Sequence, residues 1–212
     1  MKRWAYRSEL LAELSAPRYR YCLEVSELCA IAEAISATRG QAGRVVEMGV
    51  ARGMTTVFLN THLDAIGDRR KYLAIDTFAG FTAEDIEFEV AHRGKTRDAY
   101  WGFAYNDEKV FRKNMARLGF DRVEVLKLDV NCLKKEDLGS VSVAILDVDL
   151  YRPTLHALEV TYEVLEDGGY IFVDDVSQGT AYDGAGQAYL EFTERIGLQR
   201  TQIGGKCGLI RK

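Results

Sequence analysis

The sequence predicts an α/β fold in which an open, mostly parallel sheet is covered by helices on both faces. One observation is that five short apolar runs alternate with helix-like segments after residue 40. Another is that two adjacent glycines near the C-terminus separate two further short runs, which indicates an antiparallel hairpin. With 212 residues, 47% of them hydrophobic, the chain has the length and composition of one globular domain.

The elements follow in order along the chain. Apolar residues at steps of three and four predict an amphipathic helix over 22–35, formed by Cys22, Val25, Leu28, Cys29, Ala32 and Ile35. A shorter helical stretch with Leu10, Leu11 and Leu14 precedes Pro17. The expected parallel strands are Arg44–Gly49, Lys71–Asp76, Val123–Leu128, Val141–Asp147 and Gly169–Val173. The expected helices between and after them are Thr55–Ala65, Asp107–Leu118, Pro153–Leu165 and Ala185–Ile196. The hairpin joins Leu198–Ile203 to Lys206–Arg211 through Gly204 and Gly205.

Two regions stand apart from this alternation. Residues 1–40 form an N-terminal helical segment, expected to contact the acceptor or another subunit, and residues 41–212 form the main domain. Residues 77–105 are too long for an ordinary connection and follow a strand's carboxyl end, which favours a lid, although a solvated insertion with a short helix is also possible. The aromatic run Tyr100, Trp101, Phe103 and Tyr105 in it either stacks on an acceptor or packs against the sheet.

The composition limits the class of protein and its cellular location. With a net charge of −4, the chain lacks the overall positive charge that is typical of nucleic-acid-binding proteins. No apolar run reaches 18 residues and the charged N-terminus has no signal-peptide core, so we expect a cytoplasmic protein without a membrane span. The four cysteines Cys22, Cys29, Cys132 and Cys207 form no C-x-x-C pair, which favours buried, reduced thiols over metal ligands.

A glycine loop follows the first strand in the sequence E-M-G-V-A-R-G-M-T-T. Gly49 and Gly53 lie in it, with Ala51 between them, and small residues let a ligand approach the backbone closely. The pattern lacks the third glycine of G-x-G-x-x-G, so S-adenosylmethionine is favoured over NAD. Asp76, at the tip of the second strand, is placed to accept hydrogen bonds from ribose hydroxyls.

Acidic residues end two further strands. I-L-D-V-D-L-Y gives Asp147 and Asp149, and F-V-D-D-V gives Asp174 and Asp175. If these strands are neighbours, four carboxylates converge, and a hard divalent cation such as Mg²⁺ is the simplest way to relieve their repulsion. We assign Asp147, Asp174 and Asp175 to the metal and Asp149 to proton transfer, because Asp149 lies further out toward a substrate.

These motifs resemble a known family. V-V-E-M-G-V-A-R-G, A-I-D-T-F-A-G-F, I-L-D-V-D-L-Y-R-P-T-L-H-A-L-E and G-G-Y-I-F-V-D-D-V are similar to the macrocin/mycinamicin (TylF-type) sugar O-methyltransferases. The resemblance implies a class I methyltransferase fold with strand order 3-2-1-4-5-7-6, magnesium on Asp147, Asp174 and Asp175, and Asp149 as general base. It also implies cofactor contacts at Glu47, Gly49, Thr55, Asp76 and Asp129. It further implies a natural-product sugar hydroxyl as acceptor and a homodimer or higher homo-oligomer.

Other functions remain as alternatives at this stage. Catechol-type O-methyltransferases also use acids at strand ends, but that group usually has a lysine base three residues after the first metal aspartate, where this chain has Leu150. A non-catalytic S-adenosylmethionine-binding module would have no need of Asp149. A dehydrogenase would bind NAD in the same loop.

Overall fold

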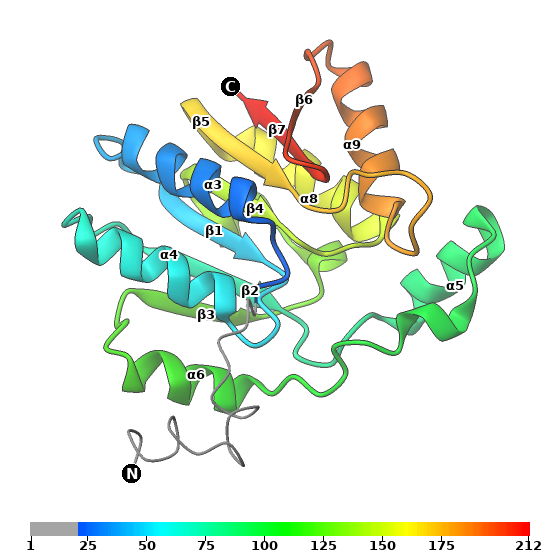
Figure 1. Ribbon diagram of the computed structural model, residues 1–212, viewed down its shortest axis with the longest axis horizontal. Coiled ribbons are helices and arrows are strands. Elements are labelled where there is room, and N and C mark those ends of the chain that lie inside the picture. Colours follow the sequence, from blue (N-terminus) through cyan, green and yellow to red (C-terminus); the bar gives the residue numbers. More distant parts are fainter. Residues whose placement is uncertain (1–20) are drawn as a thin grey trace, which may run out of the picture.

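A computed structural model describes residues 21–212 as a seven-stranded sheet with helices on both faces (Figure 1). The strand order is β3-β2-β1-β4-β5-β7-β6, as the family resemblance implies. The strands are β1 (Arg44–Met48), β2 (Tyr72–Asp76), β3 (Val123–Lys127), β4 (Val141–Leu146), β5 (Leu165–Val173), β6 (Thr201–Ile203) and β7 (Cys207–Arg211). Strand β7 pairs antiparallel with both β5 and β6, and the pairs among β1 to β5 are parallel. The predicted fold class is therefore confirmed.

Helices connect the strands and form the outer layers. They are α3 (Val25–Ala37), α4 (Met54–Ala65), α5 (Ala83–Arg93), α6 (Glu108–Arg117), α7 (Lys135–Leu138), α8 (Tyr151–Val164) and α9 (Gly184–Arg195), with 3-10 turns η2 (Arg97–Tyr100) and η3 (Val130–Cys132). Helices α3, α4 and α6 pack on one face of the sheet, and α7, α8 and α9 pack on the other. Among the described residues no helix has both the length and the hydropathy to cross a membrane.

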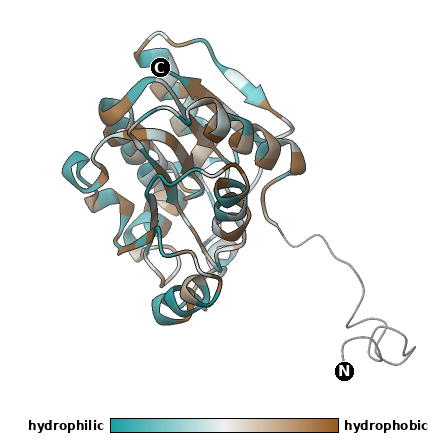
Figure 2. Ribbon diagram, turned by 90° about the vertical axis from the view of Figure 1, so that its left-hand side faces the viewer, coloured by the Kyte–Doolittle hydropathy of each residue, from teal (hydrophilic) through white to brown (hydrophobic). Residues whose placement is uncertain are grey.

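Side-chain alternation along the strands produces the two layers of core. In β1, Val45 packs with the side chains of α3 and α4, whereas Val46 packs on the opposite face with those of α8. Both side chains are fully buried. Figure 2 shows the resulting pattern, with mainly hydrophobic strands at the centre and helices of mixed hydropathy outside.

The structure corrects the predicted first helix. It begins at Val25, so Cys22 precedes it, and its buried face contains Leu28, Ile31 and Ile35 rather than Cys29. Cys22, Cys29 and Cys132 are exposed and only Cys207 is buried, so the expectation of four buried thiols is wrong for three of them. The stretch with Leu10, Leu11 and Leu14 lies outside the described residues.

Two connections are more defined than the sequence indicates. Residues 77–105 contain α5, a helix that only the alternative of an insertion with a short helix had expected, and Thr82 caps it by accepting a hydrogen bond from the Asp85 amide. The terminal hairpin has a three-residue turn, in which Lys206 follows Gly204 and Gly205 and is not part of the strand. Lys206 is thereby placed beside the end of β5.

Candidate active site

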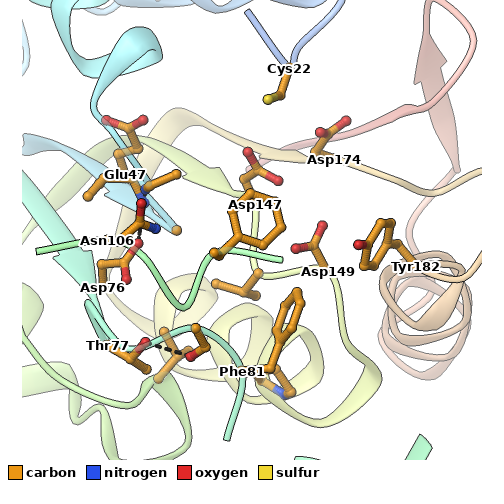
Figure 3. A pocket seen from close by; sticks show the side chains of 18 of the residues that line it. Cys22, Glu47, Asp76, Thr77, Phe81, Asn106, Asp147, Asp149, Asp174 and Tyr182 are labelled. Atoms are coloured by element: carbon orange, nitrogen blue, oxygen red, sulfur yellow. Dashed lines mark hydrogen bonds between the residues drawn. The ribbon is translucent and has the colours of Figure 1, made fainter. Parts of the chain in front are cut away.

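A cavity of about 410 Å³ lies at the carboxyl ends of β1, β2, β4 and β5. This is where open α/β sheets bind ligands, and the volume is typical of small-molecule sites. Nine of the ten predicted site residues line it: Glu47, Gly49, Thr55, Asp76, Asp129, Asp147, Asp149, Asp174 and Asp175. In Figure 3, Asp147 is central, with Asp76, Glu47 and Asn106 to one side and Asp149, Asp174 and Tyr182 to the other.

Gly53, the tenth predicted residue, does not line the cavity. It begins α4 with φ of 83°, and a Cβ there would lie 2.8 Å from Cε2 of Phe111. Gly49 has a φ of 85°, and a Cβ would lie 1.7 Å from the carbonyl oxygen of Asp147. The first glycine therefore lets the loop pass against the end of β4, and the second lets α4 begin against α6.

The Asp76 carboxylate holds the glycine loop in place. Its Oδ2 accepts hydrogen bonds from the amides of Val50 and Ala51, each at 3.0 Å, and Oδ1 accepts from the amide of Phe78 at 2.6 Å. A carboxylate has about four acceptor sites, so one remains on Oδ1 for a ribose hydroxyl. Asp76 thus shapes the loop, a role that its place at the strand tip did not reveal.

Glu47 is buried between β1 and α4. Its Oε2 accepts hydrogen bonds from Thr56 Oγ1 and from the hydroxyl of Tyr72, both at 2.6 Å. Burial raises the pKa of Glu47 from 4.5 to about 7, although both hydrogen bonds oppose the shift. These contacts anchor α4 to the sheet, so any contact from Glu47 to a cofactor must use its other carboxylate oxygen.

Thr55 and Asp129 border the cavity from two helix starts. Thr55 lies in the first turn of α4, directly after the glycine loop. Asp129 precedes η3, and its Oδ1 accepts hydrogen bonds from the amide and the side-chain Nδ2 of Asn131, each at 3.0 Å.

The four acids converge as the sequence predicts. Asp149 and Asp174 are only 8% and 5% exposed, respectively. Burial and the neighbouring acids raise the pKa of Asp147, Asp149 and Asp174 above the usual range. Strand β5 ends at Val173, so Asp174 and Asp175 lie in a turn from which both can reach the cluster.

Asp149 is held in a strained backbone conformation, with φ of 62°. The Ala185 amide at the start of α9 donates to the Asp149 carbonyl at 3.0 Å. Two residues further along, the Tyr151 amide donates to Oε1 of Glu89 at 2.8 Å. Glu89, which is 1% exposed, comes from α5, so segment 77–105 supports the turn that carries Asp149.

The positive partner of the acid cluster is Lys206, which sequence analysis missed. Its Nζ lies 2.7 Å from Asp174 Oδ2 and 3.0 Å from Asp175 Oδ1. The only signal was its place next to the Gly-Gly turn, because antiparallel pairing of β7 with β5 brings that turn to the end of β5.

The predicted metal site fits Mg²⁺ in the type of donor but not in the arrangement. Carboxylate oxygens are hard ligands, and Asp174 Oδ1 is buried without a hydrogen-bond partner in the described structure. However, two of the three predicted ligands already pair with Lys206. Within residues 21–212, no group of three or more acidic, histidine or cysteine side chains is arranged to hold a metal ion.

Aromatic side chains of segment 77–105, together with Tyr182, form one wall of the cavity. Phe81 packs against Tyr100, Phe103 and Tyr182, with ring centroids 5.7 to 6.1 Å apart. Of the predicted aromatic run, Tyr100 is buried in this cluster, and Phe103 and Tyr105 line the cavity. Trp101 is 80% exposed and is not a lining residue.

One further polar group faces the cavity from the segment after residue 105. Asn106 lines the same cavity as Asp76 and Glu47, and Figure 3 draws it on their side of Asp147. Its Oδ1 is buried without a hydrogen-bond partner in the described part of the chain. Asn106 was not predicted, because one amide in an irregular segment gives no pattern to recognise.

The strand order, with β7 antiparallel and the cavity at the carboxyl ends of the parallel strands, defines a Rossmann-like class I methyltransferase fold. The family described as Macrocin-O-methyltransferase (TylF) matches residues 24–208, and the chain belongs to this family.

Similar proteins agree with this assignment. A curated relative from Streptomyces olivaceus, 8-demethyl-8-(2,3-dimethoxy-alpha-L-rhamnosyl)-tetracenomycin-C 4'-O-methyltransferase, is 30% identical over 164 residues. The match covers 75% of this chain but only 61% of that relative. The O-methyltransferase NovP shares the fold with a TM-score of 0.74 at 20% identity, over 92% of this chain and 83% of that one. CalS11, a calicheamicin methyltransferase, does so with a TM-score of 0.72 at 16% identity, over 99% and 89%.

Proposed function

We propose that this protein transfers the methyl group of S-adenosylmethionine to a sugar hydroxyl of a small natural product, with Asp149 as the proton acceptor. The observation that carries the proposal is that Asp149 shares one cavity with the glycine loop and Asp76. Membership of the macrocin O-methyltransferase family and the similarity to a rhamnosyl-tetracenomycin methyltransferase support the reaction and the class of acceptor.

In the proposed reaction, the acceptor oxygen attacks the methyl carbon while its proton passes to Asp149. The carbon–sulfur bond breaks and its electron pair stays on sulfur, which yields S-adenosylhomocysteine. Burial and the nearby Asp175 raise the pKa of Asp149, which makes its carboxylate a stronger base than an exposed one. The glycine loop fixes the cofactor end of the cavity, and alignment of the two reactants contributes much of the acceleration.

The magnesium at Asp147, Asp174 and Asp175 stays a prediction. When bound, such an ion would lower the pKa of an acceptor hydroxyl. As the side chains lie, Lys206 pairs with two of those carboxylates.

The catechol-type alternative finds less support. The position where that group has its lysine base is Leu150, whose side chain is 1% exposed. The aromatic wall around Phe81 fits the apolar face of a sugar as well as a flat ring. The predicted homo-oligomer also remains a proposal, which light scattering of the purified chain would test.

Replacement of Asp149 by Asn tests the assigned base. We expect formation of S-adenosylhomocysteine from a panel of deoxysugar-bearing acceptors to fall by about 10²- to 10⁴-fold. Binding of S-adenosylhomocysteine, measured by calorimetry, should persist. The control is Asp167→Asn, a matched change at an exposed aspartate. Turnover at the wild-type rate in Asp149→Asn would show that Asp149 is not the base.

A further inference from the structure

Lys206 is built into the acid cluster as a fixed part of the fold. The Val176 amide, just after the Asp174–Asp175 turn, donates to the carbonyl of Lys206 at 2.8 Å, which ties the two turns together. Gly205 in the same hairpin donates its amide to Oε2 of Glu24 at the start of α3, at 2.9 Å. The Lys206 side chain is 22% exposed, so its ammonium lies largely inside the protein.

The ammonium lies where the cluster most needs positive charge. It donates to Asp174, whose side chain is 4% exposed, and to Asp175. Burial alone would lower the pKa of Lys206, but the two carboxylates raise it above its usual value. Asp147 and Asp149 border the same cavity, and the buried Glu27 of α3 also interacts with Asp174 and Lys206, so one positive charge is shared among five acids.

A resident ammonium and a divalent ion would both draw on the carboxylates of Asp174 and Asp175, of which Lys206 contacts one oxygen each and leaves Asp174 Oδ1 without a hydrogen-bond partner among the described residues. Mg²⁺ needs ligand oxygens at about 2.1 Å in an octahedral arrangement, and a positive charge bonded to two of its ligands would repel it. An ion bound through the oxygen atoms that Lys206 leaves free would lie close to the ammonium and be repelled by it, so tight binding would require Lys206 to move away. The hairpin and its contacts hold the backbone of that residue in place.

We propose that Lys206 is the resident counter-ion of the Asp174–Asp175 turn and takes the position of a divalent cation there, so that the wild-type cluster binds such an ion only weakly. The inference rests on the proposed function only in placing methyl transfer at this cavity. The geometry of the Lys206 contacts carries it.

The test is to titrate Mn²⁺ into the full-length protein, after removal of metal with EDTA, and to measure binding by electron paramagnetic resonance. Lys206→Met removes the charge while keeping much of the side-chain length. We expect Lys206→Met to bind one Mn²⁺ per chain at least about tenfold more tightly than the wild type. Lys206→Arg keeps the charge and should bind Mn²⁺ as weakly as the wild type. Lys109→Met, at an exposed lysine away from the cavity, controls for the change in net charge.

Two results would overturn the proposal. One is equal Mn²⁺ affinity in the wild type and Lys206→Met. The other is tight binding of one Mn²⁺ by the wild type, with a Kd below about 10 µM, that is lost in Asp174→Asn. The second result needs no Lys206 variant, so it decides the matter even if Lys206→Met does not fold. Binding of S-adenosylhomocysteine by the same samples is measured separately, and its absence would count against the proposed function without affecting the comparison of Mn²⁺ affinities.

Discussion

Replacing Glu47 by Gln should increase the free energy of unfolding relative to that of the wild type, and this difference should grow as the pH rises. The Glu47 carboxyl has an ordinary pKa of 4.5 when unfolded, and burial raises the pKa to about 7 in the folded protein. The folded state therefore binds the proton more tightly, and this group's contribution to stability is present below pH 4.5 and is lost as the pH rises through 7. At about 1.4 kcal/mol per pKa unit, the complete loss amounts to roughly 3.5 kcal/mol.

The amide introduced by Glu47→Gln would mimic the protonated acid. Its carbonyl oxygen can still accept from Thr56 Oγ1 and from the Tyr72 hydroxyl, but it does not titrate. We expect the free energy of unfolding of Glu47→Gln, relative to that of the wild type, to increase by about 2 to 3 kcal/mol between pH 5 and pH 8. The other titrating groups are common to both proteins and cancel in the difference.

This difference is measured by urea denaturation, monitored by circular dichroism, at pH 5, 6, 7 and 8. Equal m-values for the two proteins would show that the same unfolding transition is being compared. Glu33→Gln, at an exposed position of α3, is the matched control and should show no trend with pH. If the difference for Glu47→Gln stays constant within about 0.5 kcal/mol across the range, burial does not control the ionisation of Glu47.

Three more outcomes follow from the site. Asp76→Asn removes an acceptor for the glycine loop and should weaken binding of S-adenosylhomocysteine by about tenfold or more, measured by calorimetry; unchanged affinity would show that the loop does not depend on this carboxylate. Gly53→Ala forces a positive φ and a clash with Phe111, so urea denaturation should show a loss of about 1 to 3 kcal/mol, larger than that of Gly94→Ala, where φ is also positive but no atom lies within 4 Å. Glu89→Gln should lower the rate of methyl transfer by about tenfold without changing S-adenosylhomocysteine affinity; a loss of affinity instead would place its effect on the cofactor.

The sequence predicts the sheet well, because buried parallel strands are apolar runs of characteristic length between helices. Their ends were also well placed: β5 breaks at Val173, and the predicted Asp174–Asp175 turn reaches the cluster. The acids themselves could be recognised because each pair directly follows its strand.

Features that depend on contacts between distant segments could not be predicted in this way. Lys206 reaches Asp174 across the antiparallel pairing of β7 with β5, and Glu89 reaches the Tyr151 amide from α5. The buried face of α3 was only partly predicted: Leu28 and Ile35 were placed on it correctly, but Cys29 fits the apolar spacing as well as Ile31 does. Apolar spacing alone could not distinguish the two faces.

The bond from Glu89 to the Tyr151 amide has a consequence for how such an enzyme can change during evolution. Segment 77–105 lines part of the cavity and, through Glu89, also supports the turn that carries Asp149. Replacing this segment by that of a relative, in order to change the range of acceptors, would remove this support. The support would persist only if the replacement also contains Glu89 and its ion-pair partner Arg93. Hybrid proteins that keep this pair should therefore retain turnover more often than hybrids that alter only the aromatic wall, and natural diversification of acceptors is expected to proceed around the pair.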